Sequence, residues 1–164
     1  MKNYFLSIAL LFVGVTLFAQ SISFSSTDLN NHEITDEIFS AVDVTVVNVW
    51  ATYCSPCIRE MPDLAEWQKS MPKNMQIIGI VCDVQSTDNV KGIAHAKTIL
   101  QNAGATFKNI IANQSLSLIL NQVQFVPTTF LVDKNGNIVS DMIVGAQLDK
   151  YKKAVEVYLV ENKN

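Results

Sequence analysis

The stretch WATYCSPCIREMP, residues 50–62, holds two cysteines, Cys54 and Cys57, on either side of a Ser-Pro pair. The apolar run before them, Val44–Trp50 (VTVVNVW), is continuous and rich in β-branched residues, which is typical of a buried strand. Beyond the cysteines, apolar residues recur at helical spacing and charged residues fall on the other face. The apolar positions are Ile58, Met61, Leu64, Ala65 and Met71, and the charged ones are Glu60, Asp63, Glu66 and Lys69. The pair therefore lies where a buried strand ends and an amphipathic helix begins.

Metal ligation, a structural disulfide and a redox couple are the three interpretations of this pair. Zinc needs three or four ligands, and the sequence offers beside the pair only Cys82, His32 and His95, with no second CxxC. A disulfide between Cys54 and Cys57 closes a very short loop, which the loop-entropy model credits with the least stabilisation. We therefore expect a redox-active Cys54–Cys57 pair, with no metal and no cofactor besides the two sulfurs.

The position at a helix N-terminus suits redox chemistry. Free backbone N–H groups and the positive end of the helix dipole favour a thiolate on Cys54. Pro56 fits the first helical turn because its missing N–H loses no partner there. Cys57 lies one turn further in, so we expect it to be more buried and to attack a mixed disulfide on Cys54 from within.

Residues 1–20 (MKNYFLSIALLFVGVTLFAQ) have the build of a secretory signal peptide. Lys2 precedes an apolar run from Tyr4 to Phe18, and small or polar residues follow at Ala19 and Gln20. The run is shorter than the ~20 residues of a usual spanning helix, so we expect cleavage near Ala19 or Gln20. A retained membrane anchor is the alternative. Either way the domain, residues 21–164, is expected to work outside the cytoplasm.

The remaining composition predicts one globular α/β domain. Apolar residues make up 49% of the 164-residue chain, the net charge is −3, and the basic residues are scattered with no run longer than two, which excludes a nucleic-acid footprint. We expect a monomer.

Strands are predicted at 75–84, 107–111, 128–132 and 138–144, and helices at 89–102, at 115–121 and from 148 onward, where Leu148, Tyr151, Val155, Tyr158 and Leu159 share a face. Residues 133–136 form the turn of a hairpin, and residues 21–42 a small extension with a short helix opening at Thr35. This alternation predicts a central mixed sheet flanked by helices on both faces.

Several of these motifs resemble the thioredoxin fold, and WATYCSPCIREMPDL is similar to its extracytoplasmic TlpA/ResA-like branch. Pro62 stands where thioredoxins kink the active-site helix. Val126, Pro127 and Thr128 match the cis-proline loop that faces the cysteines, and residues 130–136 with Gly145 match the closing hairpin. The resemblance covers nearly all of residues 21–164. It implies that Val126, Pro127 and Thr128 bind substrate together with Tyr53, which takes the place of the family's tryptophan as an aromatic lip.

Departures from typical thioredoxins concern the groups around the cysteines. Thioredoxins bury an aspartate six residues before the first cysteine and a lysine on the next strand, where this chain has Asn48 and Gly79. The TlpA/ResA-like branch also has asparagine there and carries an acid three residues after the second cysteine, which Glu60 matches. Arg59 is displaced by one position from the family's arginine. Ser55, with Pro56 and Asn48, is expected to tune the redox potential.

Two residues keep alternative interpretations. Glu60 is either a solvated acid that stabilises the first turn or a partly buried carboxyl that takes and gives the proton of the cysteine pair. Cys82, inside an apolar strand, is interpreted as a buried inert thiol, the alternative being a third redox cysteine or an intermolecular partner.

The resemblance implies a thiol-disulfide reductase acting on disulfides of exported proteins and recharged by a membrane electron donor. Three alternatives remain open: a peroxidase on the same fold, a disulfide isomerase or oxidase, and a non-catalytic thioredoxin-like binding module. Retention of both cysteines argues against the binding module, and the adjacent CxxC argues against the peroxidase.

Overall fold

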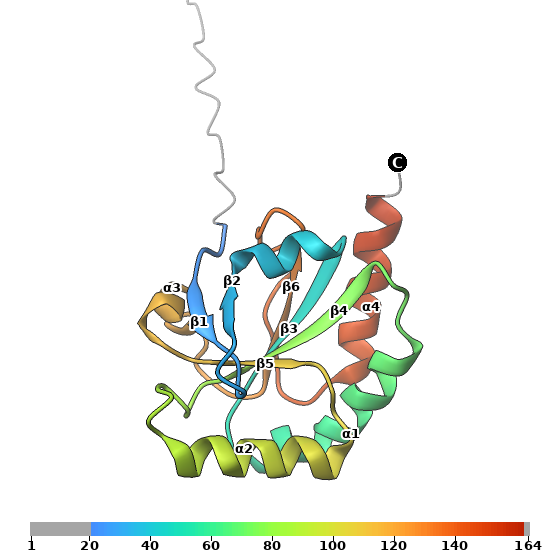
Figure 1. The fold of residues 1–164 in the computed structure, drawn as a ribbon. Coiled ribbons are helices and arrows are strands. Elements are labelled where there is room, and N and C mark those ends of the chain that lie inside the picture. Colours follow the sequence, from blue (N-terminus) through green and yellow to red (C-terminus); the bar gives the residue numbers. More distant parts are fainter. Residues whose placement is uncertain (1–20, 163–164) are drawn as a thin grey trace, which may run out of the picture.

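A five-stranded mixed sheet forms the centre of the molecule (Figure 1). The structure is a computed structural model that describes residues 21–162, so the predicted signal peptide, residues 1–20, lies outside the described residues. The strand order is β5-β4-β3-β6-β7. The three parallel strands are β3 (Val44–Trp50), β4 (Met75–Val81) and β5 (Lys108–Ile111), and the two antiparallel additions are β6 (Thr128–Asp133) and β7 (Ile143–Val144).

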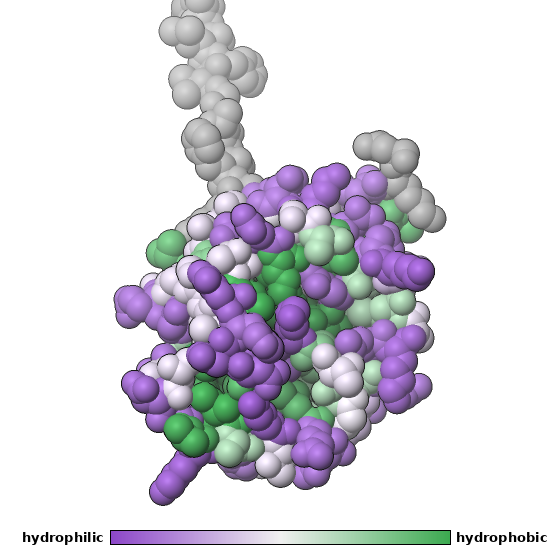
Figure 2. Space-filling view, viewed as in Figure 1, coloured by the Kyte–Doolittle hydropathy of each residue, from purple (hydrophilic) through white to green (hydrophobic). Residues whose placement is uncertain are grey.

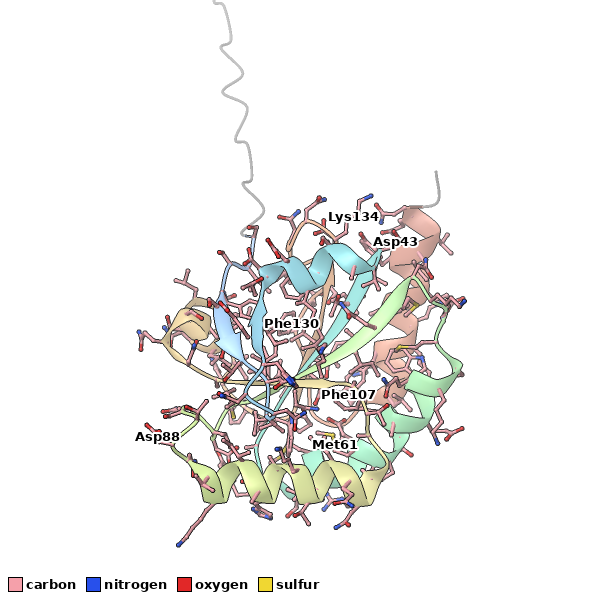
Figure 3. The ribbon with its side chains drawn as sticks, viewed as in Figure 1. Asp43, Met61, Asp88, Phe107, Phe130 and Lys134 are labelled. Carbon is pink, nitrogen blue, oxygen red and sulfur yellow. A yellow bond between two sulfur atoms is a disulfide. The ribbon has the colours of Figure 1, made fainter. Side chains whose placement is uncertain are left out.

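Helices cover both faces of this sheet, as predicted. On one face lie α1 (Ser55–Ser70), α2 (Val90–Ala103) and α4 (Leu148–Glu161), whose apolar residues form a cluster that includes Met61 and Phe107. On the other face lie the hairpin β1 (Ser25–Thr27) and β2 (Glu33–Thr35), the 3-10 helices η1 (Asp36–Ala41) and η2 (Gln114–Leu116), and α3 (Ser117–Leu120). Of the side chains labelled in Figure 3, Met61 and Phe107 belong to the first cluster and Phe130 belongs to the second.

Side chains of β3 alternate between the two faces of the sheet, and this places one polar residue, Asn48, toward α1 and α4. Every residue of β3 is buried, with Val46 and Trp50 in the cluster under α1, α2 and α4 and Val47 and Val49 in the opposite cluster. Asn48 lies between Val46 and Trp50, so it faces α1 and α4. A fully buried amide there must find hydrogen-bonding partners in that layer.

Two predicted strands are shorter in the structure. The strand expected at 138–144 is reduced to β7 and a single bridge between Val132 and Ile138, because side chains take over the ladder: Asp133 accepts from the backbone N–H of Asn137, and Ser140 Oγ accepts from that of Leu131. The strand expected to reach residue 84 ends at Val81. The β1–β2 hairpin within the extension was not predicted, whereas the short helix after Thr35 is confirmed.

The face of the molecule that carries this hairpin is mostly hydrophilic, with smaller hydrophobic areas at its centre and at its rim (Figure 2).

Candidate active site

Cys54 and Cys57 are joined by a disulfide at the N-terminus of α1, with their Cα atoms 5.3 Å apart. Cys54 is the N-cap residue, and its Sγ accepts a hydrogen bond from the backbone N–H of Cys57 at 3.2 Å. Pro56 lies in the first turn. Cys57 is fully buried and Cys54 is 6% exposed. The geometry therefore gives the outer sulfur the helix-terminal N–H and places the second sulfur behind it.

A cleft opens over Cys54. Its lining comes from three regions distant in sequence: the end of β3 with the start of α1, the segment after β4, and the end of α3 with the loop before β6. The residues are Val49, Tyr53, Cys54, Ser55, Pro56, Cys82, Gln85, Leu120, Val123, Gln124, Phe125 and Val126. Tyr53 and Phe125 form an exposed aromatic rim, at 74% and 67% exposure. The carbonyl oxygen of Val126 lies 3.4 Å from Cys54 Sγ, and the Val126–Pro127 peptide bond is cis.

Thr128 does not line this cleft. Its side chain is buried and its hydroxyl donates to the carbonyl of Phe125 at 2.7 Å, which closes the turn before β6. Pro127 is buried as well. The structure thus brings Tyr53, Ser55, Pro56 and Val126 to the cleft, whereas Thr128 shapes the loop. Phe125 was missed, although an exposed aromatic next to a Val-Pro-Thr motif is a usable signal.

Glu60, three residues after Cys57 on α1, is buried and only 5% exposed. The interpretation of Glu60 as a solvated first-turn acid is therefore wrong. The predicted faces of this helix are also wrong at two positions: Glu60, expected on the polar face, is buried, and Ile58, expected on the apolar face, is 36% exposed. Glu60 follows Cys57 by one helical turn, so both residues face the sheet. Asn48 Nδ2 donates to Glu60 Oε1 at 3.0 Å, and Tyr151 Oη lies 3.1 Å from Oε2.

Burial raises the pKa of the Glu60 carboxyl, and the hydrogen bonds from Asn48 and Tyr151 act in the opposite direction. Asn48 Nδ2 also donates to Thr129 Oγ1 at 3.0 Å, so residues of β3, β6, α1 and α4 meet around this carboxyl. Asn48 Oδ1 is buried without a hydrogen-bond partner among the described residues. A carboxyl with a raised pKa one helical turn from a buried cysteine is suited to accept and return a proton when that cysteine is reduced.

Cys82 stands in the cleft wall as a half-buried free thiol. Burial, and then the negative charge of Asp83, raise its pKa to about 11. It is therefore a neutral thiol at physiological pH, less buried than the sequence suggested. Within residues 21–162, no three His, Cys, Asp or Glu side chains gather as a metal site would require.

Two further contacts support the site from behind. Asp83 ties the loop before α1 to the end of β4, because it accepts from the backbone N–H of Thr52 at 3.0 Å and from its hydroxyl at 2.5 Å. Gly79, at the position of the thioredoxin lysine, leaves room for Asn109, whose Oδ1 accepts from Trp50 Nε1 at 2.8 Å. Neither contact was predicted, since each depends on residues from separate strands.

Comparison with known proteins agrees with this geometry. The Redoxin family matches residues 16–155, which is most of the chain. The chain belongs to the Redoxin family. The thiol-disulfide oxidoreductase ResA of Geobacillus thermodenitrificans is 32% identical over 136 residues, covering 83% of this chain and 72% of the relative. ResA of Bacillus anthracis is 33% identical over 138 residues, covering 84% and 73%.

A solved structure shares the fold. The crystal structure of a thioredoxin-family thiol:disulfide interchange protein from Chlorobium tepidum matches with a TM-score of 0.69 at 24% identity, covering 85% of this chain and 94% of that one. This Redoxin-family chain is thus a thioredoxin-like thiol-disulfide oxidoreductase of the ResA type, and the resemblance found in the sequence is confirmed. In the part of the chain that the structure describes, none of the helices is long and apolar enough to cross a membrane.

Proposed function

We propose that this protein is a reductase of disulfides in exported proteins, with Cys54 as nucleophile, Cys57 as resolving cysteine and Glu60 as proton acceptor. The Cys54 thiolate attacks a substrate disulfide, forming a mixed disulfide and releasing one substrate thiolate. Glu60 accepts the proton of Cys57, whose thiolate then attacks Cys54 Sγ and releases the second substrate sulfur. The substrate has then gained two electrons, and the Cys54–Cys57 pair has lost them.

The observation that carries the reductive direction is the charge around Cys54. The residues of the cleft, all in the described part of the chain, include no lysine, arginine or histidine. Arg59 is exposed on α1 and does not line the cleft, while the buried Glu60 adds a negative charge when ionised. The Cys54 thiolate therefore has little stabilisation beyond the helix N-terminus. A modestly stabilised thiolate corresponds to a low reduction potential, as a reductant requires.

The location and partners follow from chemistry and sequence. Residues 1–20 predict export, so the domain works outside the cytoplasm, where surroundings are oxidising. A dithiol there must be regenerated, which calls for a membrane protein that delivers electrons from the cytoplasm. The exposed Tyr53 and Phe125 offer an apolar rim to a protein substrate. We propose that the protein acts as a monomer, because one chain contains the complete site.

Two assays test this function. The dithiol form should reduce insulin disulfides, and the Cys54→Ala variant should not. In cells, Cys57→Ala should accumulate mixed disulfides between Cys54 and exported proteins, which mass spectrometry identifies, with Cys54→Ala as the matched control. Failure to reduce insulin together with rapid consumption of hydrogen peroxide would favour the peroxidase instead.

A further inference from the structure

Tyr151 reaches the buried carboxyl from a different part of the chain. It lies in the first turn of α4, is fully buried, and its hydroxyl touches three polar groups. Oη is 2.6 Å from the carbonyl oxygen of Gly145 and 3.1 Å from Glu60 Oε2, and it accepts from the backbone N–H of Gln147 at 3.1 Å. The sequence placed Tyr151 on an apolar helix face, where a buried hydroxyl needs partners.

The hydroxyl cannot donate to both acceptors at once. A phenol has one proton and two lone pairs, and the N–H of Gln147 occupies one lone pair. When Glu60 is ionised, its carboxylate is an acceptor only and draws the Tyr151 proton into a charge-assisted bond. When Glu60 is protonated, its O–H can donate to the second lone pair of Oη, and the Tyr151 proton returns to the carbonyl of Gly145. The arrangement around Tyr151 therefore depends on one proton on Glu60.

Gly145 connects this arrangement to the loop beside Cys54. Its backbone N–H donates to the carbonyl oxygen of Pro127 at 2.7 Å, and the preceding residue, Val126, has its carbonyl next to Cys54 Sγ. Gly145 is therefore held on both sides, by Tyr151 at its carbonyl and by Pro127 at its N–H, so a donor gained or lost at the carbonyl shifts this residue and changes the length of its N–H bond to Pro127.

We propose that Tyr151 is a positioning residue that holds Glu60 and transmits its protonation state through Gly145 to the Pro127 loop. This inference rests on the proposed proton role of Glu60 and names a second residue for it. The other groups around Glu60 are the charged Asp63 on α1, Cys57 one helical turn before it, and the neutral Asn48 on β3; the neutral Thr129 on β6 bonds to Asn48 and also neighbours the Tyr151 hydroxyl. Asp63 raises the pKa of Glu60, whereas Tyr151 lowers it.

Nuclear magnetic resonance of the reduced protein tests the link directly. In the unmodified protein, the amide proton of Gly145 should titrate with the same midpoint as the side-chain carboxyl carbon of Glu60. In Tyr151→Phe, which keeps the buried ring, the Glu60 midpoint should shift to higher pH and the Gly145 titration should be lost. A Gly145 amide that stays constant while Glu60 titrates would overturn the proposal, without any need for a variant.

Thiol-exchange kinetics separate this inference from the function on which it rests. Tyr151→Phe should slow exchange roughly three- to tenfold near neutral pH and move the acid limb of the pH profile upward. In a Glu60→Gln background the same change should have less than about a twofold effect, because the group it positions is gone. Equal slowing in both backgrounds would mean a merely structural tyrosine.

Tyr158→Phe is the matched control, because Tyr158 lies on the same helix with Asp133 and Asp43 as its charged neighbours. It should leave both midpoints unchanged, and a shift equal to that of Tyr151→Phe would contradict the proposal. If Glu60→Gln left the exchange profile unaltered while Gly145 still titrated with Glu60, the proton role would fail and the Tyr151 link would stand.

Discussion

At the scale of single residues, Cys54 and Cys82 line one cleft in opposite surroundings. Cys54 accepts a helix-terminal N–H, whereas burial and Asp83 raise the pKa of Cys82 to about 11. In the reduced protein, iodoacetamide should therefore alkylate Cys54 first and spare Cys82. The pH at which the Cys54 rate is half-maximal should lie below ~8.5, the pKa of a free cysteine thiol. Mass spectrometry of the labelled peptides measures this. A Cys54 midpoint at or above that pH, or equal labelling of Cys82, would refute the helix-terminus argument.

Glu60 should also affect the pH dependence of the free energy of unfolding. Since burial raises its pKa above the ordinary 4.5, the folded protein holds this proton more tightly than the unfolded chain does. Its contribution to the free energy of unfolding is therefore full below the ordinary value and lost as pH rises through the raised one. Relative to the unmodified protein, Glu60→Gln should gain stability as pH rises from the ordinary value of 4.5 through the raised pKa of Glu60, measured by urea denaturation. A constant difference across that range would contradict the burial argument.

At the scale of elements, the sequence pattern predicted the helices and strands best where their own residues determine them. The bounds of β3 were predicted correctly because a continuous β-branched run leaves little ambiguity. The polar and apolar faces of α1 were predicted less well. The sequence pattern places the charged Glu60 toward solvent, and only the fold shows that Asn48 and Tyr151 provide hydrogen bonds for it inside the protein. The prediction of a strand at 138–144 was wrong over most of its length. The side chains of Asp133 and Ser140 accept backbone N–H groups in place of strand-to-strand hydrogen bonds, and hydrophobic periodicity does not reveal this.

Gly79 tests the packing between β4 and the neighbouring strands. A Cβ at Gly79 would overlap the side-chain amide of Asn109, which accepts from Trp50. Gly79→Ala should therefore lower the free energy of unfolding by about 1–3 kcal/mol, measured by chemical denaturation. The control is Asn109→Ala: once Asn109 is truncated, adding Gly79→Ala should cost little more. Full additivity of the two losses would show that the amide is not the obstacle.

At the scale of the whole molecule, the cleft is assembled from loops that no local pattern could bring together. The cysteines were identified from their position between a strand and a helix, and the proline loop through the resemblance, whereas the roles of Phe125, Tyr151 and Asp83 became apparent only in the fold. Export belongs to this scale too and stays a prediction from residues 1–20. The intact mass of protein recovered from outside the cytoplasm should correspond to cleavage near Ala19 or Gln20. The full-length mass would instead indicate a retained anchor.

The reduction potential of the Cys54–Cys57 pair tests the central claim most directly. A cleft without positive charge and with a buried acid behind it leaves the Cys54 thiolate modestly stabilised, so the potential should lie nearer thioredoxin's ~−270 mV than DsbA's ~−120 mV. Equilibration of the protein against dithiothreitol and glutathione couples, with the oxidised fraction measured by thiol trapping, gives the value. A potential near that of thioredoxin is the result predicted for a reductase. A potential above about −180 mV would contradict the account, because such a pair oxidises or reshuffles its partners.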